Sequence, residues 1–198
     1  MTEEQIEVTL AITQAMADEL TDYLMGDTLY HQLVVKTAAG TKQPKMTVGA
    51  LLENLEDLRW AARQGQLTSQ QQKTLKAIED KIDLARGAFA NQWADKLRHE
   101  LNGLLSSWRW YLQDVARNPE ARENYASEAR KRTRIALVMQ ALAGDAEARE
   151  QRQELAQLDQ DLRETLEPGG YVGPRDQENR YGQSQAWWLH GRPAAEPD

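Results

Sequence analysis

A ridge of apolar side chains between residues 75 and 115 constrains the fold of this chain more than any other feature. Twelve apolar residues follow one another at intervals of three or four, so that forty residues are covered in eleven steps. The average step of about 3.64 residues matches a straight α-helix better than the 3.5 of a heptad coiled coil. The ridge therefore predicts a nearly straight helix within a bundle. It consists of Leu75, Ile78, Ile82, Ala85, Phe89, Trp93, Leu97, Leu101, Leu104, Trp108, Tyr111 and Val115.

An unbroken helix over residues 69–116 would be about 70 Å long, at about 1.5 Å per residue. Gly87 and Gly103 lie inside this stretch. A glycine within a helix costs about 1 kcal/mol relative to alanine, so a bend or break at either position stays open.

Shorter helices are predicted on both sides of the ridge. Thr47 and Asn118 are suitable N-cap residues, and the proline that follows Asn118 fits the first position of a helix. The predicted fold is all-α, a helical bundle of about five helices with one long central helix. The flanking helices are expected over residues 3–25, 48–64, 119–143 and 146–166.

Residues 29–47 break the helical rhythm. A two-residue alternation with β-branched residues late in the run, followed by a turn signal at residues 38–41, predicts a short β-hairpin or an extended arm. Pro44 would restrict the return strand to an edge. Because an isolated hairpin is marginal in water, this arm has to lean on the helices.

The last segment, residues 168–198, has the composition of an irregular tail. It nevertheless contains Tyr171, Trp187 and Trp188, and aromatic side chains are unusual in a freely solvated linker. We therefore expect a helical bundle domain over residues 1–167, followed by a tail that packs on the bundle or on a partner.

The composition excludes several classes of protein. The chain has no cysteine, which rules out a disulfide scaffold, a zinc–thiolate site and a cysteine nucleophile. The acidic N-terminus lacks the apolar core of a signal peptide. No stretch approaches the roughly 18 apolar residues that a membrane span needs. A cytoplasmic protein with no membrane partner is expected.

The net charge of −7 is unevenly distributed along the chain. Residues 1–65 carry a balance of −5, residues 66–143 carry +4, and residues 144–198 carry −6. A basic middle between acidic ends is self-complementary. It gives little support to nucleic-acid binding, for which a net basic face is expected.

The strongest basic run consists of Arg130, Lys131, Arg132 and Arg134. Such a run suits a nucleic-acid accessory factor that contacts phosphates. The neighbouring Glu128 and the acidic flanks favour a solvated face or an internal partner for acidic helices instead. Nucleic acid is therefore not the expected partner.

No catalytic motif is present, whether a nucleophile elbow, a phosphate-binding glycine loop or a zinc-protease helix. The three histidines, His31, His99 and His190, all lack the glutamate three residues earlier that a di-iron bundle uses. We therefore assign no catalytic residue, no metal ligand and no cofactor. A small-molecule or metal-dependent enzyme with its site inside the bundle stays the alternative.

Four tryptophans are candidate partner-binding residues. Trp60 and Trp110 fall on polar helix faces, and Trp187 and Trp188 lie in the tail. Tryptophan is enriched among interface anchors, although cover of a ring on a polar helix face by another helix or by the tail of the same chain is the more expected arrangement. The leading hypothesis is a non-enzymatic protein–protein interaction or scaffold protein. Its partner is another protein or a second copy of the chain, as a homodimer.

Overall fold

The structure, a computed structural model, describes residues 1–115 and 117–194. Most of these residues are helical, and short antiparallel strand pairs accompany the helices, so the predicted all-α class is confirmed with a minor β component. In this described part, no helix combines the length and the apolar character needed to cross a membrane. The chain divides into two compact units, with the boundary after Glu100, whereas the sequence placed a domain boundary at residue 167.

The apolar ridge is shared between two helices, α3 (Ser69–Ala88) and α4 (Ala90–Val115). They meet at Phe89, whose backbone leaves the helical region at φ −126° and ψ 45°. The Phe89 N–H still donates to Ala85 O at 2.9 Å, and the break lies two residues after Gly87. A single unbroken helix is therefore not formed. The interruption lies close to Gly87, one of the two glycines at which the sequence allowed a bend or break.

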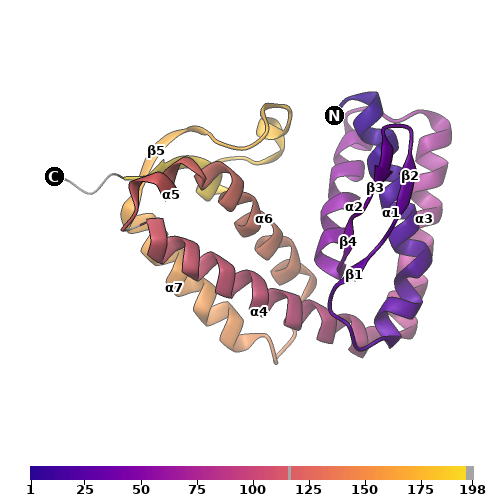
Figure 1. Ribbon diagram of the computed structural model, residues 1–198, viewed down its shortest axis with the longest axis horizontal. Coiled ribbons are helices and arrows are strands. Elements are labelled where there is room, and N and C mark those ends of the chain that lie inside the picture. The colour runs from indigo at the N-terminus through magenta and orange to yellow at the C-terminus, as the bar shows by residue number, and fades with distance from the viewer. Residues whose placement is uncertain (116, 195–198) are drawn as a thin grey trace. The chain divides into compact units, whose positions relative to one another are not determined.

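Unit 1, residues 1–100, packs three helices and the start of α4 around the first half of the ridge. Each of the three begins at a threonine whose hydroxyl accepts a backbone N–H: Thr2, Thr47 and Thr68. Thr2 and Thr68 belong to complete capping boxes. Figure 1 shows α1 beside α2 and α3. The first two helices are α1 (Glu3–Met25) and α2 (Val48–Arg63), close to the predicted bounds.

The predicted hairpin is present and lies against α1 and α2. Its register is constant, with Val35 opposite Lys42. In the middle, the Leu33 N–H donates to Pro44 O at 3.0 Å, but proline has no N–H to return the bond. This gap divides the ladder into two short pairs. The strands are β1 (His31–Gln32), β2 (Val35–Thr37), β3 (Gly40–Lys42) and β4 (Lys45–Met46).

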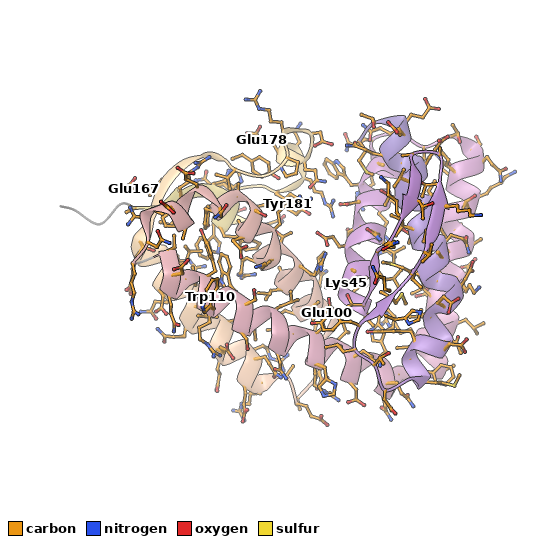
Figure 2. The ribbon with its side chains drawn as sticks, in the orientation of Figure 1. Lys45, Glu100, Trp110, Glu167, Glu178 and Tyr181 are labelled. Atoms are coloured by element: carbon orange, nitrogen blue, oxygen red, sulfur yellow. The ribbon has the colours of Figure 1, made fainter. Side chains whose placement is uncertain are left out.

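The carboxylate of Glu100 is buried at the N-terminus of α2 (labelled in Figure 2). It accepts hydrogen bonds of 2.7 Å from the Thr47 hydroxyl and from the Gly49 N–H. A helix N-terminus favours a negative charge because its first N–H groups have no partner within the helix. Glycine at position 49 lets the carboxylate approach this closely, since a Cβ there would lie 2.4 Å from Glu100 Oε1 and the carboxylate would have to shift.

At the C-terminal end of α1, a buried cation, Lys96, binds backbone carbonyl groups. Its ammonium group donates to Gly26 O at 2.7 Å and to Thr28 O at 2.6 Å, and it lies 4.7 Å from the centre of the Tyr23 ring. Burial lowers the pKa of Lys96, an effect that the charge of Asp27 opposes. A cation at this position satisfies carbonyls that the helix leaves unpaired.

Unit 2 begins at residue 101 and builds on the second half of the ridge. Asn102 of α4 accepts from Gln151 of α7 at 3.0 Å, and Ser107 of α4 accepts from Lys131 of α6 at 3.1 Å. The helix predicted over residues 119–143 is interrupted at residue 124. The helices are α5 (Pro119–Glu123), α6 (Tyr125–Ala141), α7 (Arg149–Thr165), η1 (Arg175–Arg180) and η2 (Trp187–Leu189).

The segment after α7 contains two strands that the sequence pattern did not predict. Residues 168–170, Pro-Gly-Gly, lie inside β5 (Leu166–Tyr171), which pairs with β6 (His190–Pro193). Gly191 allows this pairing because its φ is 155° and a Cβ there would lie 2.4 Å from Glu167 O. The backbone of the tail is therefore paired with itself within unit 2.

Glu100→Ala is expected to lower the free energy of unfolding by about 2–3 kcal/mol, because it leaves buried donors without their acceptor. Urea denaturation measures this value, and exposed Glu7→Ala is the control, with a change below about 0.5 kcal/mol. In the Glu100→Ala background Gly49→Ala should cost less than in the wild type, because the clash with the carboxylate is gone. Strictly additive effects of the two substitutions would contradict this account of the contact.

Candidate interaction surfaces

Trp110 is the most exposed of the six tryptophans, with 67% of its surface accessible (labelled in Figure 2). It lies on α4 two residues after Trp108, which is fully buried. Two residues turn a helix by about 200°, so the two rings point to opposite sides. Ser106 and Gln113, on the same face as Trp110, are also exposed. The ridge therefore buries one side of α4 and leaves Trp110 on the other.

Trp60 is half-buried on α2 of unit 1. The guanidinium group of Arg63 lies 5.7 Å from the centre of its ring, a cation–π distance. Arg63 in turn lies 3.8 Å from a carboxylate oxygen of Glu56. Part of the Trp60 ring is thus covered by its own helix.

Trp187 and Trp188 attach the tail of unit 2 to its helices. Trp188 is 6% exposed, and its indole N–H donates to the Thr133 hydroxyl at 3.1 Å. The guanidinium groups of Arg132 and Arg163 lie 4.1 Å from the Trp188 ring centre and 4.0 Å from that of half-buried Trp187. The two tryptophans therefore bind cationic side chains of α6 and α7, and Trp188 belongs to the interior of the unit.

Arg132 is the centre of this arrangement. Its Nε and Nη2 donate to the two carboxylate oxygens of Asp159, each at 2.7 Å, and both residues are buried. A paired guanidinium and carboxylate with parallel hydrogen bonds offset much of the cost of burying two charges. Because Asp159 lies on α7 and Arg132 on α6, the pair fixes these two helices in register.

The basic run of α6 does not form one surface. Arg130 is exposed, Lys131 donates to Glu128 at 2.6 Å, Arg132 is buried, and Arg134 is half-buried. Two of the four candidate phosphate contacts are thus engaged inside the unit. Nucleic-acid binding by this run was not the expected role, and of its four basic residues only Arg130 is fully exposed.

The Tyr125 hydroxyl ties the tail to the start of α6. It donates to Trp188 O at 2.6 Å, and the tyrosine is fully buried. Its ring lies 6.4 Å from that of Tyr111, which stacks on Trp108 at 5.6 Å. Burial raises the pKa of the Tyr125 phenol above its ordinary value of 10.0, and the charge of Asp159 adds to this shift.

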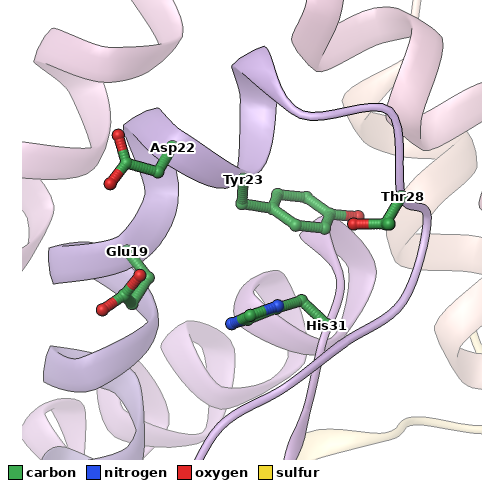
Figure 3. A pocket seen from close by; sticks show the side chains of 5 residues that line it. All are labelled: Glu19, Asp22, Tyr23, Thr28 and His31. Carbon is green, nitrogen blue, oxygen red and sulfur yellow. The ribbon is translucent and has the colours of Figure 1, made fainter.

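Unit 1 has a small surface hollow where the chain leaves α1 (Figure 3). Its volume is about 110 Å³, below the roughly 300 Å³ at which pockets for small organic ligands begin. The Tyr23 hydroxyl at its wall donates to Leu29 O at 2.7 Å, so the phenol is already engaged. The hollow is lined by Glu19, Asp22, Tyr23, Thr28 and His31.

The histidines lie in separate surroundings. His31 lines the hollow, His99 is exposed on α4, and Nε2 of His190 lies 2.7 Å from Tyr181 O. Over the ranges 1–115 and 117–194, no three histidine, aspartate or glutamate side chains gather as ligands for a metal ion.

Sequence reasoning missed other exposed apolar residues. Tyr30 and Val34 on the hairpin are 56% and 70% exposed, and Leu84 on α3 is 75% exposed. The alternation along residues 29–37 contained the signal for the first two, because Leu33 and Val35 occupy the opposite face of the strand. Leu84 does not belong to the ridge. Because it follows the ridge residue Ile82 by two positions, its side chain points to the outer side of α3.

Comparison of the chain with protein-family models, with curated proteins and with solved structures finds no match. Any role of these surfaces therefore has to be inferred from the residues that form them. Trp110 marks an exposed apolar site in unit 2, and Tyr30 with Val34 marks one in unit 1.

Tyr125→Phe is expected to cost about 1–2 kcal/mol near pH 8, because the buried Trp188 carbonyl loses its donor. The raised pKa of Tyr125 means that its stabilising effect is present below pH 10.0 and is lost as the pH rises beyond that value. The variant should therefore show a weaker fall of stability above pH 10.0, as measured by urea denaturation across this range. Tyr30→Phe, with its exposed ring, is the control, and an equal alkaline slope for Tyr125→Phe and wild type would refute the assignment.

Proposed function

We propose that the protein is a non-enzymatic interaction or scaffold protein that binds its partner through the exposed side of α4. The observation that carries this proposal is Trp110, a large aromatic residue with 67% of its surface accessible. Interface energies concentrate in a few anchor residues, among which tryptophan is enriched. Folding does not bury the accessible part of this ring, so burying it contributes nothing to the stability of the fold. Binding of a partner would bury it and gain that energy.

The surroundings of Trp110 suit an approaching surface. Gly103, Ser106 and Gln113 lie one to two turns away on the same side of the helix, and all three are exposed. These three residues are uncharged, and two of them are small, but half-buried Asp114 lies one turn after Trp110 and charged Arg109 lies next to it. The neutral, low part of this surface lies on the N-terminal side of Trp110, at Gly103 and Ser106, and charged groups lie at its edge.

Contacts with α7 and with the interior of unit 2 hold this side of α4 in place. Arg109, next to Trp110, forms an ion pair with Glu154 of α7, and Asn102 accepts from Gln151 of the same helix. The buried ring of Trp108 fixes the opposite side of α4. A preorganised surface loses less conformational entropy on binding, which favours affinity.

The partner is another protein or a second copy of the chain. Deleting residues 168–198 is not a selective test of this role, because it also removes buried Trp188, whose carbonyl and indole bond to Tyr125 and Thr133. A substitution at the exposed ring separates binding from folding.

Trp110→Ala is expected to weaken self-association or partner binding by about 10-fold or more, as truncation of an anchor residue does. Sedimentation velocity over a concentration series measures self-association, and affinity purification from the native cell with mass spectrometry identifies other partners. Because the ring is exposed, thermal stability should stay close to that of the wild type.

Gln113→Ala, on the same face, is the matched comparison and should weaken binding much less than Trp110→Ala, because binding energy is concentrated in the anchor residue. The proposal fails if Trp110→Ala has the sedimentation behaviour and the partners of the wild type. It also fails if the wild-type chain is a monomer at all concentrations and no protein co-purifies with it.

A further inference from the structure

The hairpin of unit 1 presents a second surface, which differs from the Trp110 side in charge and shape. In an antiparallel pair, residues directly opposite each other point to the same face, and successive residues alternate between faces. The constant register therefore places one set of residues on the outer side of the hairpin. All of them are exposed: Gln32, Val34, Lys36, Thr41, Gln43 and Lys45, here called the outer hairpin face.

The opposite face holds the hairpin in place. Leu33, Val35 and Met46 are 6%, 7% and 0% exposed, and they anchor the strands on the helices of the unit. On the outer side, the amide of Gln32 donates to Gln43 across the strands at 3.2 Å. The outer hairpin face is therefore a supported platform, although the hairpin has only two strands.

Two large apolar groups lie on this platform without cover. Val34 is 70% exposed near its centre, and Tyr30 is 56% exposed at its end. Both residues would lose apolar surface to water if a second chain lay across the strands. An exposed apolar patch framed by polar residues is typical of interaction sites.

The charge of the platform is of one sign. No aspartate or glutamate occurs between residues 28 and 52, although the whole chain carries a net charge of −7. Within the described ranges, Lys36 and Lys45 form no ion pair with a carboxylate, and Lys45 lies 6.0 Å from the centre of the Tyr30 ring. The platform is thus a basic and apolar site on a largely acidic protein.

The spacing of these groups defines the shape of a complement. Lys45 lies opposite Gln32, at the same level along the hairpin. Val34 therefore lies two residues beyond the level of Lys45, and Lys36 lies two residues beyond Val34. At about 3.3 Å per residue, the two ammonium groups branch from levels about 13 Å apart, with the apolar group halfway between them. An extended peptide has the same rise, so its residues i, i+2 and i+4 match the three positions.

We propose that the outer hairpin face binds an extended acidic segment of a partner protein. The segment has carboxylates at positions i and i+4, which face Lys36 and Lys45, and an apolar residue at i+2, which packs on Val34. A nucleic acid would also meet the two lysines, but it would lie against a chain of net charge −7 and leave Val34 without an apolar partner. This inference concerns a surface of unit 1 and does not depend on Trp110.

The test uses a labelled peptide of sequence Gly-Glu-Ser-Leu-Ser-Glu-Ser-Gly and fluorescence anisotropy at an ionic strength of about 0.02 M, where exposed charges are weakly screened. A peptide of the same composition with adjacent glutamates, Gly-Glu-Glu-Ser-Leu-Ser-Ser-Gly, should bind more weakly. The double variant Lys36→Gln with Lys45→Gln should lower the affinity for the first peptide by about 10-fold. Val34→Ser should lower it as well, because the apolar contact is lost.

Lys42→Gln is the matched control, because Lys42 is exposed on the same hairpin but opposite Val35, on the other face. It should change the affinity by less than about 3-fold, and Trp110→Ala should leave it unchanged. Circular dichroism establishes that each variant is folded. The inference is wrong if wild-type protein does not distinguish the two peptides, if Lys42→Gln matches the double variant, or if oligothymidylate binds more tightly than the first peptide.

Discussion

Burial of one continuous apolar ridge is the constraint on which both units depend. The ridge residues of α3 and early α4 are buried in unit 1, and those of later α4 are buried in unit 2 except for Leu104, which is half-buried beside fully buried Leu105. Burying each large apolar side chain contributes about 1.5–3 kcal/mol, so the ridge decides which side of each helix faces inward. The same constraint decides what stays outside. Because Trp108 is fixed in the interior, Trp110 has to project from the opposite side of α4.

Buried charges supply the specificity that an apolar ridge lacks. Glu100 binds the N-terminus of α2, and Arg132 with Asp159 joins α6 to α7. Each interaction is satisfied at one register of the helices, since a shift would leave a charge buried without its partner. Arg132 also supports the ring of Trp188, which connects the helices to the tail. The surfaces proposed for binding are presented by helices and strands fixed in this way.

Local signals in the sequence predicted most of the helical framework and part of the candidate site. The N-cap at Thr47 is where the structure places it, because a hydroxyl that binds its own helix is specified by nearby residues. The burial of Arg132 and the capping role of Glu100 depend on partners 27 and 51–53 residues away, which no local pattern contains. Likewise, residues 168–170 belong to a segment with the composition of an irregular tail, yet pairing with a distant strand makes them part of β5. The period of the ridge, in contrast, was enough to place Trp110 on the side opposite Trp108, although it did not decide whether another segment of the chain covers the ring.

The apolar ridge turns Trp110 outward while it buries the neighbouring aromatic rings. Acrylamide quenching of tryptophan fluorescence measures this accessibility directly. Trp110→Phe is expected to remove the largest quenchable part of the emission, and Trp60→Phe, at a half-buried position, is expected to remove less. Quenching that is unchanged in Trp110→Phe would contradict the account, as would a loss of the same size on substitution of buried Trp93.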